Sequence, residues 1–181
     1  MEFNLYSSVA LLSRTPSALD ALLRDLPEAW LSANEGEKTW PPIDIVTHYL
    51  YTEQVNWMPR ARHILEHGET EPFPPFKRFG HLTGPGTKSL PQLLDAFASA
   101  RAASLSELRS WSLSPSDLAR RGQHPALGST TLAELLSAWT VHDLTHLHQL
   151  TRVLAVQYTE AVGPFRKFLG VLHCAGHSAP A

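Results

Sequence analysis

Residues 132–154, LAELLSAWTVHDLTHLHQLTRVL, decide the fold expected of this chain. Apolar side chains recur there at helical spacing and predict one long amphipathic helix. They are Leu132, Leu135, Leu136, Trp139, Leu150 and Val153. His142 and His146 lie four residues apart on the same stripe, so their side chains share the core-facing side of the helix. Such a stripe rarely carries two imidazoles, and a metal site is therefore the first hypothesis to test.

The spacing of these two histidines has a partial parallel in the zincin helix. Two histidines four residues apart bind zinc there, and a glutamate between them serves as the catalytic base. In this chain Asp143 follows the first histidine and the glutamate is absent. The sequence therefore suggests a metal site and argues against a protease.

The composition is that of a globular protein. A length of 181 residues fits one domain with a sizeable core, which we place at residues 1–175, followed by a short flexible tail at 176–181. Apolar residues make up 43% and charged residues 18%, so the chain is not of the disordered class. The net charge of −2 and the absence of a basic stripe argue against nucleic acid as a partner.

Cysteine usage and hydropathy predict a soluble, cytoplasmic protein. A single cysteine, Cys174, cannot form an internal disulfide or a cysteine-based zinc cluster, and it suits a reducing compartment. We find no basic segment followed by an apolar core at the N-terminus, so no secretory signal is expected. No apolar run approaches the roughly 20 residues that cross a bilayer, so no membrane partner is expected.

Three further helices are expected before the opening stretch. They run from Pro16 to about Asp25, from Pro41-Pro42 to Leu65, and from Ser89 to Trp111. In the second of these, a stripe of Ile45, His48, Thr52 and Val55 faces the other helices. Pro59 should kink or divide the helix, because proline removes a backbone donor and crowds the preceding turn.

The remaining segments are expected to be short or irregular. Residues 69–89 form a long Pro/Gly-rich loop, in which three phenylalanines either line a cavity mouth or hold the loop to the bundle. Residues 114–128 carry two helix-cap-like turns, SPSD and HPALG, and Ser129 or Thr130 caps the opening helix, which continues to about Tyr158. A short helix at residues 165–172 follows. Because no strand pattern is evident, the fold class is all-α, most simply a four-helix bundle with additional short helices.

Only three of the ten histidines are embedded in apolar periodic stretches, namely His48, His142 and His146. The others are expected at the surface or at helix ends: His63, His67, His81, His124, His148, His173 and His177. Two ligands from one helix and one from a facing helix could surround a divalent metal and leave positions open for water or substrate. Hydrogen-bonded core histidines are the alternative that the spacing leaves open.

Three passages resemble the DinB-like (DinB/YfiT) superfamily of metal-binding four-helix bundles. They are PPIDIVTHYLYTEQVNW around His48, VHDLTHLHQLTRVL around His142 and His146, and AVGPFRKFLGVL near the C-terminus. The second is similar to the family's H-x-x-x-H helix, and the third to its V-G-P-aromatic-Arg closing segment. The three passages occur in the family's order and span about residues 43–172.

The resemblance implies an up-down-down-up bundle that frequently forms homodimers. It also implies a divalent metal, most often nickel or zinc, bound by His48, His142 and His146. Enzymatic members are thiol-dependent S-transferases and isomerases, in which the metal holds a low-molecular-weight thiol as its thiolate. For this chain the implied partners are such a thiol and an electrophilic small molecule.

The leading functional hypothesis is a metal-dependent thiol S-transferase or hydrolase. Neutral imidazole ligands leave the metal its full positive charge, so a bound water or thiol ionises near neutral pH. Asp143, Glu53 and Gln149 are the candidates for catalytic or substrate-contacting roles, and each also has a structural interpretation. The alternatives are a non-catalytic metal-stabilised binding or stress-response module, and a bundle whose histidines are merely structural.

Overall fold

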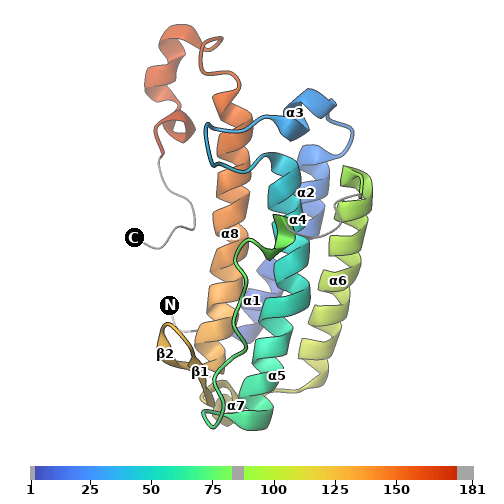
Figure 1. Ribbon diagram of the computed structural model, residues 1–181, viewed down its shortest axis with the longest axis vertical. Helices are drawn as coiled ribbons and strands as arrows, with labels where there is room; N and C mark the ends of the chain where they lie inside the picture. Colours follow the sequence, from blue (N-terminus) through green and yellow to red (C-terminus); the bar gives the residue numbers. More distant parts are fainter. Residues whose placement is uncertain (1–2, 83–87, 175–181) are drawn as a thin grey trace.

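Helical segments run side by side as a bundle in the computed structural model, which describes residues 3–82 and 88–174 (Figure 1). Within these residues, four segments form the bundle. They are α1 (Leu5–Leu12) with α2 (Thr15–Leu23); α4 (Pro42–Thr52) with the π-helical turn η1 (Glu53–Trp57) and α5 (Met58–His67); α6 (Leu90–Ser110); and α8 (Leu132–Val156). The tail expected at 176–181 lies outside the described residues.

The order of helix directions is the one expected. In Figure 1 the α1–α2 segment runs upward, α4–α5 and α6 both run downward, and α8 runs upward. Two consecutive helical segments can be parallel only if the chain returns along the bundle between them. The described part of the loop after α5 does this, since it climbs along α5 to the short 3-10 helix η2 (Gly80–Leu82), which contacts α4. The all-α, up-down-down-up prediction is confirmed.

Pro59 divides its helix as predicted, through a π-helical turn. Proline has no N–H to donate to the preceding turn of the helix. The π-helical turn, Glu53–Trp57, ends two residues before Pro59. The turn inserts one residue into the helical register. Val55, predicted to face the other helices, is consequently 45% exposed, and Asn56 is buried instead. The sequence prediction for Val55 was therefore wrong.

A β-hairpin that the sequence did not predict precedes α8. Strand β1 (Arg121–His124) pairs antiparallel with β2 (Gly128–Thr131), and the HPALG stretch forms the bend between them instead of a helix cap. Thr131, and not Ser129 or Thr130, caps α8, because its side chain accepts a hydrogen bond from the backbone N–H of Glu134. The predicted SPSD cap is confirmed, with Ser114 capping α7 (Pro115–Leu118).

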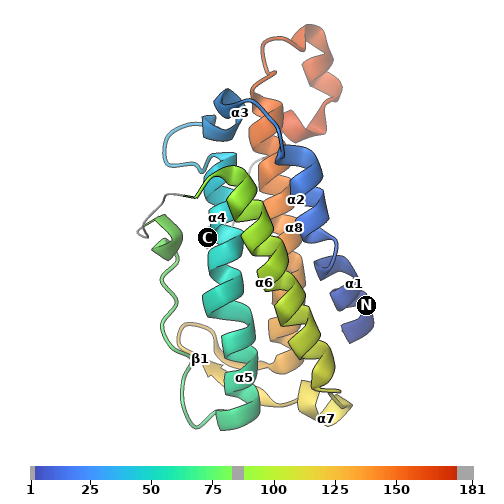
Figure 2. The ribbon, with the colours of Figure 1, turned by 90° about the vertical axis from the view of Figure 1, so that its right-hand side faces the viewer.

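The remaining short elements lie at the ends of the bundle. They are α3 (Glu28–Ser32) and two 3-10 helices, η3 (Gly163–Phe168) and η4 (Gly170–Leu172), at the place where a short helix was expected. Figure 2 shows α3 and the residues after α8 at the end of the bundle opposite the hairpin and α7. Among residues 3–82 and 88–174, no helix combines the length and apolarity required to cross a membrane.

Two apolar clusters fill the bundle, one toward each end. The first contains Val9, Met58, Leu105 and Trp139 among others, and the second contains Leu19, Ile45, Phe97 and Leu150 among others. On every helical segment, buried polar residues lie in sequence between the members of the two clusters. These residues are Thr15, Thr52, Glu53, Asn56, Arg101, Ser104, Asp143, His146 and Gln149, and the buried His48 lies one helical turn before Thr52. A polar layer therefore crosses the middle of the bundle, and the candidate site lies in it.

Candidate metal centre

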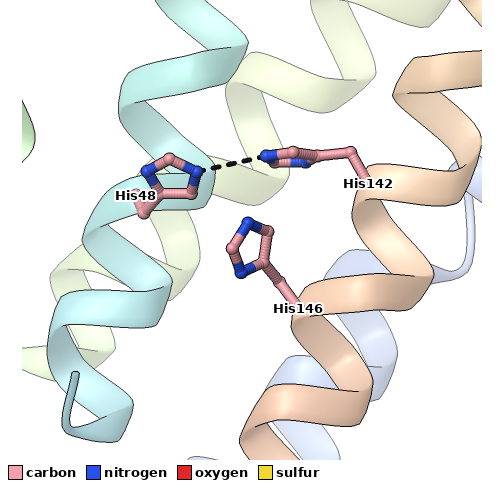
Figure 3. A group of neighbouring side chains, drawn as sticks. All are labelled: His48, His142 and His146. Atoms are coloured by element: carbon pink, nitrogen blue, oxygen red, sulfur yellow. Dashed lines mark hydrogen bonds between the residues drawn. The ribbon is translucent and has the colours of Figure 1, made fainter. Parts of the chain in front are cut away.

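Three histidines from two helices meet in the polar layer. His48 comes from α4, and His142 and His146 come from consecutive turns of α8 (Figure 3). One ring nitrogen of each lies within 4.8 Å of the corresponding nitrogens of the other two. The Nε2 atoms of His48 and His142 are 3.1 Å apart. The structure thus brings together the three residues that the sequence selected as metal ligands.

The three imidazole rings are largely buried from solvent. His48 and His146 are 3% and 1% exposed, whereas the side chain of His142 retains 17% exposure. Burial, followed by the neighbouring imidazoles, lowers the pKa of His48 to about 2. Burial, followed by His142, lowers the pKa of His146 to about 3. Both imidazoles are therefore neutral at physiological pH and keep a lone pair for a cation.

Hydrogen bonds outside the group set the orientation of His146. Its Nδ1 lies 2.8 Å from Oε1 of Gln149, an acceptor, so this nitrogen carries the proton and Nε2 keeps its lone pair. Among the described residues, the buried Nδ1 of His142 has no hydrogen-bond partner, and the nearest carboxylate oxygen, Oδ1 of Asp143, is 3.9 Å away. Three converging ring nitrogens, together with one buried ring nitrogen that has no hydrogen-bond partner, fit a divalent metal ion.

Asp143 and Glu53, two of the three catalytic candidates, both bind a buried arginine that the sequence did not indicate. Arg101 on α6 donates to Oδ2 of Asp143 at 2.6 Å and, through Nη2, to Oδ1 at 3.2 Å. Its Nε also donates to Oε2 of Glu53 at 3.0 Å. Thr15 gives Asp143 another hydrogen bond of 2.6 Å. The two carboxylates and the guanidinium form one ion network beside the histidines.

The two carboxyl groups of this network titrate differently. Burial works against ionisation of Asp143, but His142, Arg101 and Thr15 outweigh it and lower the pKa of that carboxyl. Burial dominates at Glu53 and raises its pKa despite the same arginine. Asp143 is therefore the firmly ionised partner of Arg101, and it anchors α8 to α6 directly beside His142.

An aromatic wall completes the site on the side of the long loop. Trp40 stacks over His146 with ring centroids 6.0 Å apart, and its ring also lies 4.5 Å from that of His81. His81 is buried, with its Nδ1 3.5 Å from Nδ1 of His48. The prediction of a surface or capping role for His81 was wrong. No periodic pattern marks His81, since it lies in an irregular stretch beside Gly80.

The predicted surface or helix-end position is confirmed for His67, His148 and His173. His148 is exposed on the outer side of α8, and His67 ends α5 beside Gly68, whose positive φ closes the helix. His173 is exposed, whereas His63 and His124 are half-buried. His177 lies outside the described residues. No further histidine of the described residues joins the group around His142 within metal-binding distance.

Comparison with known proteins identifies the family. The sequence matches the model of the DinB superfamily over residues 11–150, which include all three histidines of the group. The chain belongs to the DinB superfamily. Among solved DinB-like structures, YfiT from Bacillus subtilis has 16% sequence identity and a TM-score of 0.72, with 87% of each chain covered. YfiT is described as a probable metal-dependent hydrolase with an unusual four-helix bundle topology.

A second solved structure supports the same fold. The four-helix bundle protein TT2238 is 25% identical, with a TM-score of 0.56, and the match covers 82% of this chain and 98% of TT2238. The search of curated proteins gives no significant match. The comparisons therefore establish the DinB superfamily and its bundle, and the chemistry has to be argued from the site.

Proposed function

We propose that His48, His142 and His146 bind one divalent metal ion, nickel or zinc, and that the protein is a metal-dependent enzyme. The observation that carries this proposal is the meeting of three imidazoles, with one ring nitrogen of each within 4.8 Å of the others, at the centre of the bundle. Three protein ligands of this type leave positions for water or substrate, whereas a structural zinc site uses four. The partial exposure of His142 marks the side from which a substrate would approach.

Lewis-acid activation of a coordinated water or thiol is the chemistry that such an ion supplies when bound. The chain's own residues prepare this chemistry. Gln149 keeps the proton of His146 on Nδ1, and Trp40 and His81 exclude water from the buried side of the ligands. Because Arg101 engages Asp143 and Glu53, we assign these two carboxylates a positioning role instead of a general-base role.

Two reactions fit the site. The description of YfiT as a probable metal-dependent hydrolase supports attack by water. Transfer of a low-molecular-weight thiol to an electrophile is the reaction that the resemblance to the DinB-like enzymes implies. Both reactions require the same three ligands, so one set of variants tests the centre and a choice of substrates separates the reactions.

Elemental analysis of the purified chain is the first test. We expect close to one nickel or zinc ion per chain in the wild type and loss of that ion in His142→Ala. His148→Ala is the matched control, because His148 lies on the same helix but is exposed. Wild-type metal content in His142→Ala would show that the proposed site is wrong.

Turnover assays then distinguish the reactions. The metal-loaded protein is incubated with a chromogenic ester, and separately with a chromogenic electrophile and a panel of low-molecular-weight thiols. Turnover that depends on both thiol and metal supports the transferase, and ester cleavage without thiol supports the hydrolase. If the metal is bound but neither reaction occurs, and its removal only lowers thermal stability, the protein is a metal-stabilised binding module.

A further inference from the structure

Arg60 on α5 is a buried cation whose charge no carboxylate balances. The residue is 8% exposed, and burial lowers the pKa of its guanidinium. Among residues 3–82 and 88–174, no aspartate or glutamate forms an ion pair with it, and no hydrogen bond from its nitrogens to a protein group is present. Its nitrogens are not among the fully buried polar atoms that lack a partner, so the guanidinium keeps some contact with solvent. A charged side chain is rarely this deeply buried without an acidic partner, so the choice of arginine at this position calls for a physical reason.

Two aromatic rings of the long loop surround the guanidinium. Its central carbon lies 5.2 Å from the ring centre of Phe73 and 5.9 Å from that of Phe76. Ring faces attract a cation but do not replace the hydrogen-bond acceptors that a guanidinium loses on burial. An apolar side chain could also fill the space between the two rings, without the cost of a largely buried charge. Packing of the loop therefore does not explain why this residue is an arginine.

The guanidinium borders a pocket between the loop and the helices. The pocket has a volume of about 190 Å³, and its lining includes Tyr51 and His63 from the helices and Lys77 from the loop. Figure 1 shows the loop running alongside α5 and α4, where these residues lie in the chain. Lys77 is exposed and brings a second positive charge to the rim, while no acidic residue is among the described residues that line the pocket. The pocket is therefore positively charged.

We propose that this pocket binds a small anion that carries a carboxylate or phosphate group. The planar guanidinium of Arg60 presents parallel N–H donors that match two oxygens of such a group, and Lys77 supplies a second positive charge at the rim. Phe76 and the prolines of the loop would cover the apolar part of an organic anion. The volume lies below the 300–1,000 Å³ usual for drug-sized ligands, so the ligand is small.

The anion pocket lies apart from the histidine centre. Arg60 is twelve residues beyond His48 on the same helical segment, which at the helical rise corresponds to roughly 18 Å. None of the aromatic or polar contacts of Arg60 involves the three histidines. If the three histidines bind no metal, the proposal of anion binding is unaffected. If the pocket binds no anion, the metal proposal is unaffected.

Titration with inorganic phosphate and, separately, with succinate tests the proposal on the full chain. Binding is followed by the NMR shifts of the backbone amides of α5 and of the loop, at constant ionic strength set with chloride. We expect saturable binding of one anion per chain for at least one of the two probes. Arg60→Met should weaken it at least about tenfold, because a charged hydrogen-bonded pair is lost. Arg62→Met, which removes a charge two residues away on the same helix, should leave the affinity unchanged.

Three results would overturn the proposal. The first is the absence of saturable binding for both phosphate and succinate. The second is equal affinity for the probe in Arg60→Met and the wild type. The third is that added chloride displaces the bound probe equally well from Arg60→Met and from the wild type. If Arg60→Met does not fold, Lys77→Gln decides, since Lys77 is exposed and its replacement leaves the core intact. A several-fold loss of affinity in Lys77→Gln supports the pocket, and unchanged affinity refutes it.

Discussion

The regions around Arg101 and Arg60 both bury a guanidinium, and they satisfy it in opposite ways. Arg101, at the centre of the bundle, is 2% exposed and donates to two carboxylates and to the backbone oxygen of Leu12. Arg60, under the long loop, is 8% exposed and has only aromatic rings as neighbours of its charge. A charge whose partners all lie within the protein contributes to one specific arrangement of helices. A charge without such partners remains available to a ligand.

Arg101 also connects the structural and the functional parts of the molecule. Its partner Asp143 is the one buried acidic residue of α8, and it lies next to His142. Tyr49, next to His48 on α4, donates a hydrogen bond of 2.5 Å to the backbone oxygen of Asp143. The two histidine-bearing helices and α6 are thereby fixed to one another at the height of the candidate metal centre.

The largest effect is expected from Arg101→Met. Loss of the guanidinium leaves Glu53 and Asp143 buried without their cation, and breaking such a pair typically costs about 3–5 kcal/mol. Urea unfolding of metal-free protein measures the change, with Arg109→Met, at the exposed end of the same helix, as the control. A loss below about 1 kcal/mol would contradict the structural role of the network.

Gln149→Ala is expected to have the next largest effect, on metal affinity. The variant removes the acceptor that orients His146, and loss of such a partner typically weakens metal binding about 10–100-fold. Competition with a chromogenic chelator gives the affinity. Gln157→Ala, near the end of the same helix, is the control and should bind metal as the wild type does. Equal affinity in the two variants would mean that Gln149 does not orient the ligand.

Arg60→Met should hardly change the stability of the ligand-free protein. The methionine fills a similar space between Phe73 and Phe76 and relieves an unpaired buried charge, so we expect a change within about 1 kcal/mol, of either sign. Urea unfolding of Arg60→Met and of Arg101→Met in the same chloride buffer compares the changes in free energy of unfolding of the two variants. If both variants lost several kcal/mol of unfolding free energy, Arg60 would contribute to the stability of the fold as Arg101 does, and the contrast between the two arginines would be wrong.

The smallest effect is expected for an exposed pair. Arg62 donates two hydrogen bonds to Glu107, at 2.6 and 2.7 Å, and both side chains are at least one-third exposed. Solvent screens such pairs, so a double-mutant cycle with Arg62→Ala and Glu107→Ala should give a coupling of about 0.2–1 kcal/mol. Raising the salt concentration should reduce it further. A coupling near that of the Arg101 network would remove the distinction between buried and exposed pairs.

The helices and the grouping of three histidines could be predicted because both follow from the spacing of apolar residues. His48, His142 and His146 interrupt apolar stripes, and these stripes must face one another in a bundle. Caps were predictable wherever serine and proline mark a helix start, as at Ser114. These signals are local, and the structure preserves them.

The residues that were missed depend on contacts that are distant in the sequence. Strand β1 gives no apolar alternation, and its Gly122 is needed only because a Cβ there would lie 2.7 Å from both Ile64 and Phe73. His81 becomes part of the centre because the loop folds back over α4, and Arg101 lies in an alanine-rich stretch with no sign of its partners. No pattern within one segment encodes these placements.

The π-helical turn at Glu53–Trp57 has a consequence for comparing this chain with its relatives. It adds one residue to the helix, and each residue turns an α-helix by about 100°. His48 lies before the turn and Arg60 after it, so a relative with a regular helix there would present one of the two positions on a different face. An alignment of DinB-like sequences therefore has to place a one-residue gap between these positions whenever the relative lacks the π turn.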